Sequence, residues 1–171
     1  MKTATRTALA ALTAATLAGC GSFIHEGPTN QQIEDRTGLT VAEASPIVAH
    51  NFGLIWPIPV SVDIGDVTTV GTGCRTDPNS LRSEGPPWRP RYVMEEVNPS
   101  QEFIDRAMSN LEAMTARGFT LEPSQRPDKD PANRVYRDSR GYTVSSFRLL
   151  PGGDPTDVRF SMTASSPCAA E

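Results

Sequence analysis

Two histidines are the chain's candidates for a general base near neutral pH. His25 lies in a polar stretch near the N-terminus, and His50 stands beside Asn51 at the end of a weak helical pattern. A hydrolytic Ser-His-Asp site needs its base held against both partners, and no Gly-x-Ser-x-Gly turn accompanies His50. His50 is the one realistic base of a hydrolase, but the sequence predicts no catalytic residue.

The acidic residues have the pattern of solvated surface charges and not that of a catalytic or metal-binding site. Glu95 and Glu96 are neighbours in an expected strand, so their carboxylates point to opposite faces and cannot flank one bond. The three aspartates Asp128, Asp130 and Asp138 lack the ligand spacing of a calcium loop. These patterns predict no metal ion and no cofactor.

The first nineteen residues have the pattern of a secretory signal. A basic start precedes an apolar run over residues 8–17, which is about half the length that a membrane-spanning helix needs. The run ends in Leu17-Ala-Gly-Cys20, which resembles the lipobox of bacterial lipoproteins. That resemblance implies cleavage after residue 19 and a diacylglyceryl group on the Cys20 thiol. Two acyl chains would anchor the protein stably to the outer face of a membrane.

Two further cysteines, Cys74 and Cys168, are 94 residues apart. With Cys20 assigned to lipid, an even number remains in an exported chain, which favours a disulfide. A metal site is the alternative, but two single cysteines without a nearby histidine do not have the spacing of a zinc site. Closing so long a loop would stabilise the fold by roughly 4–5 kcal/mol in the chain-entropy treatment.

The charge balance argues against a nucleic-acid partner. Residues 1–19 hold two of the 16 basic residues and none of the 20 acidic ones, so the mature chain of 152 residues has a net charge of −6. Phosphate backbones and anionic lipid surfaces repel such a protein. We expect no nucleic acid to bind, and we expect the lipid on Cys20 to do the anchoring.

One segment is locally basic, in contrast to the net negative charge of the chain. Residues 75–90 are rich in proline, glycine, serine and arginine, which is typical of an exposed loop. Arginine and exposed aromatic side chains are enriched at interface hot spots. The segment and its end therefore offer a candidate partner-binding loop, made of Arg82, Trp88, Arg89 and Arg91. The alternative is a solvated loop whose Trp88 packs into the domain.

The mature chain is expected to begin with a tether over residues 20–39, which are polar and lack a sustained period. Residues 40–171 are then expected to form a single domain. Thr40 opens a capping box for a short helix that contains Pro46. Residues 52–60 are strongly apolar, but their two prolines predict an edge strand or a lid. Residues 60–74 are typical of a strand region with a break at Gly65.

The clearest element is a helix over residues 99–117. Asn98 is its expected N-cap, Pro99 its first residue, and Gly118 its left-handed end. Six apolar residues recur at helical spacing and should face the core: Phe103, Ile104, Ala107, Met108, Leu111 and Met114.

Five strand-like segments surround this helix, at residues 91–97, 119–122, 134–137, 142–150 and 157–164. Turn-forming runs separate the last three, and consecutive strands with short turns predict an antiparallel sheet. The expected fold class is α+β: an antiparallel sheet of about four or five strands packed by one main helix, with a disulfide and an N-terminal tether.

Several short motifs occur in a recognisable order over residues 70–169. They are Arg91-Tyr92 on a strand, Ala116-Arg-Gly-Phe119 at a helix end, Gly141-Tyr142 in a hairpin and Ser165-Ser-Pro-Cys168. This order resembles a group of small uncharacterised lipoproteins of actinobacteria. The resemblance implies the α+β fold and a Cys74–Cys168 bridge, and it implies no activity.

Two classes of function remain open. The first is a binding or accessory module of the cell envelope that binds a protein, a glycan or a small lipid. The alternative is an envelope hydrolase using His50. A cavity lined by Trp56, Tyr142 and Val144 would favour a small-ligand carrier. A filled core with an exposed Trp88 loop would favour a protein partner.

Overall fold

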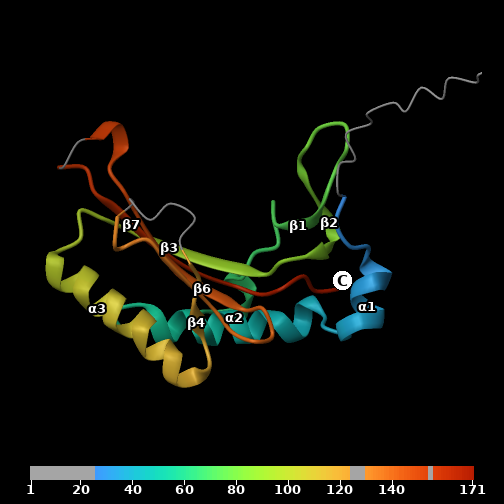
Figure 1. The fold of residues 1–171 in the computed structure, drawn as a ribbon, viewed down its shortest axis with the longest axis horizontal. Helices are drawn as coiled ribbons and strands as arrows, with labels where there is room; N and C mark the ends of the chain where they lie inside the picture. Colours follow the sequence, from blue (N-terminus) through green and yellow to red (C-terminus); the bar gives the residue numbers. More distant parts are fainter. Residues whose placement is uncertain (1–25, 124–129, 154–155) are drawn as a thin grey trace, which may run out of the picture.

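The computed structural model describes residues 26–123, 130–153 and 156–171. A five-stranded antiparallel sheet carries helices α2 and α3 on one face, and a two-stranded hairpin and helix α1 lie at one end (Figure 1). The helices are α1 (Asn30–Thr37), α2 (Val41–Ile55) and α3 (Gln101–Ala113), with 3-10 turns η1 (Ile64–Asp66), η2 (Met114–Arg117) and η3 (Pro151–Gly153). The strands are β1 (Gly73–Thr76), β2 (Ser83–Trp88), β3 (Arg91–Val97), β4 (Thr120–Leu121), β5 (Arg134–Arg137), β6 (Thr143–Leu149) and β7 (Arg159–Ser165). The expected α+β fold is confirmed, but two helices cover the sheet instead of one.

The large sheet has the strand order β3-β7-β6-β5-β4. Strands β4 to β7 form the expected meander, and β3 adds to the free edge of β7, so α3 carries the chain from one edge of the sheet to the other. Alternation in β7 places Phe160, Met162 and Ala164 on the helix-covered face, where all three are buried. None of the described helices covers the other face, as antiparallel sheets allow, and this face exposes Val93 and Phe147.

Helix α2 corrects the prediction of a short first helix followed by an edge strand. Its capping box at Thr40 and Glu43 is present, but the helix continues to Ile55 and takes in the start of the apolar stretch. Pro46 lies inside it, where the missing N–H removes one intrahelical bond. Complete burial of Phe52 and Ile55 outweighs that loss, and the helix ends at Trp56 because Pro57 follows.

Helix α3 has the predicted buried face but not the predicted beginning. Ser100 is the N-cap and accepts the Phe103 N–H at 3.2 Å. Asn98 has a positive φ of 51°, and its side chain accepts the Val158 N–H at 2.8 Å, so it ties the β3 end to the strand opposite. Gly118 ends the helical segment in the left-handed region, as expected.

The segment expected to be an exposed loop, residues 75–90, forms most of the β1–β2 hairpin instead. Proline at positions 86 and 87 is compatible with a short edge strand, where a missing N–H costs little. The expected strand over residues 60–74 is also wrong. It contains η1 and a single bridge from Thr68 to Arg91, and β1 begins only at Gly73.

Part of the expected tether is folded. Within residues 20–39, the structure describes residues 26–39, and Asn30–Thr37 form α1 with Ile33 buried. The carbonyl of Glu26 accepts the Thr76 N–H at 2.9 Å, and its carboxylate pairs with Arg75 at 2.9 Å. The chain is therefore already bound to the hairpin at Glu26.

The predicted disulfide is present and joins Cys74 in β1 to Cys168, with the Cα atoms 6.0 Å apart. Backbone hydrogen bonds between Trp88 and Ala169 lie beside it, at 2.9 and 2.7 Å. The C-terminal segment also pairs with the N-terminal one, because the Val41 N–H donates to the carbonyl of Ala170 at 2.8 Å. Hairpin, α1 and C-terminus thus form one end of the molecule (Figure 1).

Candidate ligand-binding cavity

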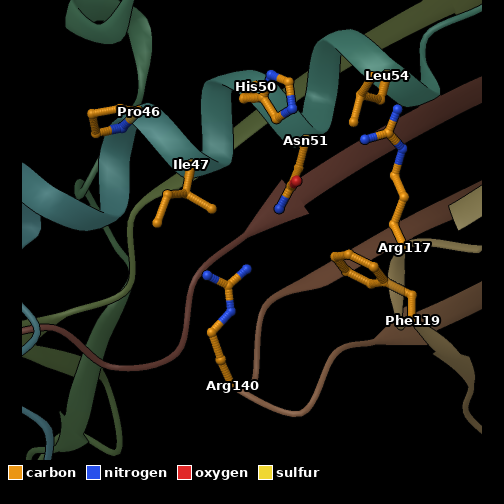
Figure 2. A pocket seen from close by; sticks show the side chains of 8 residues that line it. All are labelled: Pro46, Ile47, His50, Asn51, Leu54, Arg117, Phe119 and Arg140. Atoms are coloured by element: carbon orange, nitrogen blue, oxygen red, sulfur yellow. The ribbon is translucent and has the colours of Figure 1, made fainter.

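An open hollow lies beside α2, facing the η2–β4 junction and the turn between β5 and β6. Its volume is about 390 Å³, which is within the usual range for small-molecule sites. Its lining combines apolar side chains with a few polar ones. Figure 2 labels the eight residues, which are Pro46, Ile47, His50, Asn51, Leu54, Arg117, Phe119 and Arg140. We call this hollow the α2 cavity.

A second hollow of about 390 Å³ lies on the other flank of α2. Pro46, His50 and Leu54 line both hollows, because residues four apart form one ridge along a helix. The far wall of the second hollow is mainly apolar and includes Val60 and Val62. It offers fewer polar groups to fix a ligand than the α2 cavity does.

Two turns bring the opposite wall of the α2 cavity into place. Gly118 has a φ of 86°, which reverses the chain after η2 and sets Arg117 and Phe119 on the two sides of one tight bend. The Phe119 N–H donates back to the carbonyl of Met114 at 3.2 Å, and its ring is buried. The β5–β6 turn then supplies Arg140 from a separate part of the chain.

Asn51 is the unusual residue of this site. It is only 7 % exposed, its carboxamide points from α2 toward the cavity (Figure 2), and no described residue forms a hydrogen bond with it. Buried polar groups normally have partners, because an unmade hydrogen bond is costly. Asn110 on α3, which is half-buried, has such partners, since its amide nitrogen lies 3.3 Å from the carbonyl oxygens of both Ile55 and Trp56.

Arg140 is fixed in position by its own turn. Its Nε and Nη2 atoms both lie 3.0 Å from Oδ2 of Asp138, and its guanidinium carbon lies 5.0 Å from the ring centre of Tyr142. Asp138 is in turn held by the backbone N–H groups of Arg140 and Tyr142, at 3.0 and 2.8 Å. Such an arrangement orders a long side chain before any ligand arrives.

Tyr142 lies beneath this turn and is itself poorly satisfied. Its hydroxyl is buried and has no hydrogen-bond partner in the described part of the chain. Burial raises the pKa of Tyr142, with Asp138 and Glu43 adding to the rise and Arg140 opposing it. The residue therefore stays neutral and packs as a core aromatic.

His50 is exposed on the α2 ridge, and within the described ranges it forms no hydrogen bond with a serine or a carboxylate. Ser61 shares the second hollow with it, but no acidic residue is among the described residues that line either hollow. The described geometry does not assemble the Ser-His-Asp arrangement that a hydrolase using His50 requires.

The other residues singled out from the sequence lie away from this cavity. Arg82 stands at the turn of the β1–β2 hairpin, whereas Trp88 and Arg89 lie at its opposite end, so the length of β2 separates them. Trp88 is half-buried and its ring packs over Gly85; Arg89 lies 3.7 Å from the sulfur of Cys168. Arg91 is exposed in β3.

Three residues named as a possible cavity lining belong to the core instead. Trp56, Tyr142 and Val144 are all buried in the main cluster beneath the sheet. Cys20 lies outside the described residues. No helix in the described ranges is long and apolar enough to cross a membrane, and the described side chains form no group of three potential metal ligands.

The sequence pointed to His50 but not to the other polar residues of the α2 cavity. Arg117 and Arg140 were visible only as neighbours of the turn glycines Gly118 and Gly141, and Asn51 only as a neighbour of His50. Comparison with known proteins adds no functional assignment, because no family model, curated protein or solved structure matches the chain.

Proposed function

We propose that the chain is a lipoprotein, anchored by Cys20 to the outer face of a membrane, whose folded domain is a binding module of the cell envelope. The anchor rests on the signal-like start and the lipobox-like Leu17-Ala-Gly-Cys20. The kinship with small actinobacterial lipoproteins belongs to the same proposal. The disulfide is consistent with it, because such bonds persist in exported proteins.

The position of the folded domain fits a short connection to the anchor. Glu26 is already bound to the β1–β2 hairpin and lies six positions after Cys20. Six residues span at most about 21 Å. The hairpin end of the domain would thus stay close to the lipid. The connection would be much shorter than the twenty-residue tether that the sequence predicted.

Binding is carried by one observation: Asn51, which is only 7 % exposed and has no hydrogen-bond partner among the described residues, faces the α2 cavity. A carboxamide in this position can complete its hydrogen bonds with a ligand in the cavity. The alternative, an envelope hydrolase using His50, needs a serine and a carboxylate that hold this base. We prefer binding because the described residues give His50 neither.

The test is native mass spectrometry of the lipidated protein released from its own membranes. Ile47→Trp should fill the α2 cavity and abolish any non-covalent adduct, because the Ile47 side chain points into the cavity (Figure 2). Val93→Trp is the matched control, since Val93 is 45 % exposed on the uncovered sheet face. An adduct that persists in Ile47→Trp, or a wild-type protein without any adduct, contradicts binding at this cavity.

The anchor has a separate test. Cys20→Ser should move the protein from the membrane fraction to soluble or uncleaved forms, because serine cannot accept the thioether-linked lipid. A variant that stays in the membrane fraction as a cleaved chain would rule out lipid attachment at Cys20.

A further inference from the structure

The charge of the α2 cavity is opposite to that of the protein. Arg117 and Arg140 line it together with His50, and no acidic residue is among the described lining residues. The mature chain as a whole has a net charge of −6. A basic hollow in an acidic protein attracts anions locally, even though the overall field repels them.

Arg117 and Arg140 differ in how far their guanidinium groups are already paired with an acidic residue. Arg140 forms an ion pair with Asp138 through its Nε and Nη2, so it offers its remaining N–H groups more than a free charge. Arg117 forms no ion pair or hydrogen bond with any described residue and is exposed at the end of η2. It is the uncompensated cation of the site.

Three polar side chains line the same cavity from different elements. Figure 2 shows the Arg117 guanidinium beside Leu54 and the Arg140 guanidinium on the other side of the view, with the Asn51 carboxamide directed from α2 into the cavity between them. A guanidinium edge and an amide nitrogen both donate hydrogen bonds, as an oxyanion requires. Ile47, Leu54 and Phe119 supply an apolar wall beside these donors.

We propose that the α2 cavity binds an amphiphilic anion, in which a phosphate or carboxylate group meets Arg117, Arg140 and Asn51 while an apolar chain covers the Ile47–Leu54 face. This inference rests on the proposed binding function and adds the chemical class of the ligand. Such a group occurs both in free organic acids or phosphates and in lipid headgroups, and the test separates the two sources.

The experiment is an NMR titration of the mature chain carrying Cys20→Ser, followed through backbone amide signals. Hexyl phosphate should shift the signals of residues 47–54 and 117–119, and its affinity should fall as salt is added. Hexanol and hexyltrimethylammonium share the chain but lack the anion, so they should bind at least tenfold more weakly. Inorganic phosphate lacks the chain and should also bind more weakly.

Two variants assign the effect. Arg117→Gln should weaken hexyl phosphate binding by about tenfold, since a charge-assisted hydrogen bond is lost. Arg82→Gln removes an exposed arginine at the hairpin turn and should change nothing. Sedimentation with phosphatidylglycerol and phosphatidylcholine vesicles identifies the source. Binding to phosphatidylglycerol alone, lost in Arg117→Gln, indicates a lipid headgroup; hexyl phosphate binding without vesicle binding indicates a free anion.

The outcomes distinguish a failure of the anionic ligand class from a failure of the α2 cavity as a binding site. Equal binding of hexanol and hexyl phosphate, or an unchanged affinity in Arg117→Gln, overturns the anionic ligand but leaves an apolar binding cavity standing. No shift at residues 47–54 and 117–119 with any of the four probes overturns both the ligand class and the cavity as a binding site.

Discussion

Replacing Asn51 by leucine should make the free protein more stable. The asparagine is 93 % buried without a described partner, since only 7 % of it is exposed, and an unmade hydrogen bond of a buried group costs about 1–3 kcal/mol. The carboxamide faces an open cavity, which reduces that cost, while a leucine adds apolar burial. We expect the free energy of unfolding to rise by about 1–2 kcal/mol, which corresponds to roughly 2–8 °C in Tm for a chain of this length.

Asn110→Leu is the matched control, because it makes the same chemical change with the opposite expected sign. It removes donors that lie 3.3 Å from the carbonyl oxygens of Ile55 and Trp56 and leaves those groups less well satisfied. The free energy of unfolding should fall by about 1–2 kcal/mol.

Urea unfolding of the disulfide-bonded mature chain, followed by tryptophan fluorescence and circular dichroism, measures the free energy of unfolding of both variants. An m-value equal to that of the wild type shows that the difference is one of stability. If Asn51→Leu is destabilised as much as Asn110→Leu, Asn51 is a satisfied structural residue and the reasoning behind the site fails. In Asn51→Leu, hexyl phosphate should also protect less against unfolding than in the wild type, since ligand binding is linked to stability.

Three further results are expected. Leu111→Ala should lower the free energy of unfolding by about 2–5 kcal/mol because Leu111 is fully buried, while the exposed Glu112→Ala changes it by less than about 0.5 kcal/mol; equal effects in urea melts would mean that the buried face is misassigned. Tyr142→Phe should keep or raise stability, because the Tyr142 hydroxyl is buried without a described partner. Burial also raises the pKa of Tyr142, so the folded state holds the phenolic proton more tightly. The stability that this linkage contributes is present below about pH 10 and is lost as the pH rises further. In melts at alkaline pH, the free energy of unfolding should therefore fall less steeply with pH in the phenylalanine variant than in the wild type. Thiol titration of the unreduced, folded Cys20→Ser chain should find no free thiol, because Cys74 and Cys168 are bonded; two reactive groups would contradict the bridge.

The sequence predicted elements whose signals are local. The β7 alternation, the α3 stripe and the Gly118 ending are all set by residues within a few positions of each other, and all are present. Asn98 is the counter-example. It is a strong capping residue, yet it bonds to Val158, sixty residues away, and Ser100 takes over the cap.

Helix α2 shows how tertiary burial overrides local signals. Pro57 and Pro59 predicted a non-helical stretch over residues 52–60, but both lie beyond the helix end. Pro46, inside the helix, removes only one hydrogen bond. Packing of Phe52 against Tyr92, with ring centres 4.7 Å apart, and the burial of Ile55 stabilise the helix through partners that no local pattern reveals.

The α2 cavity could not be predicted because its parts come from three distant segments. Asn51 lies on α2, Arg117 at the end of η2, and Arg140 in the β5–β6 turn. Each residue type is ordinary on a surface. Only the register of the sheet and the course of α2 bring the three together, so the site emerges from the fold and not from a motif.

The intact mass of the mature protein, taken from its own membrane fraction, tests the lipid anchor and the disulfide together. A lipid anchor at Cys20 predicts a chain that begins at Cys20, carries a diacylglyceryl adduct on that residue and lacks residues 1–19. After reduction, its mass should increase by two hydrogens, because Cys74 and Cys168 are joined in the exported domain. A mature chain that begins at another residue, or one whose Cys20 carries a free thiol, would contradict the lipid anchor and with it the placement of the binding module at the membrane.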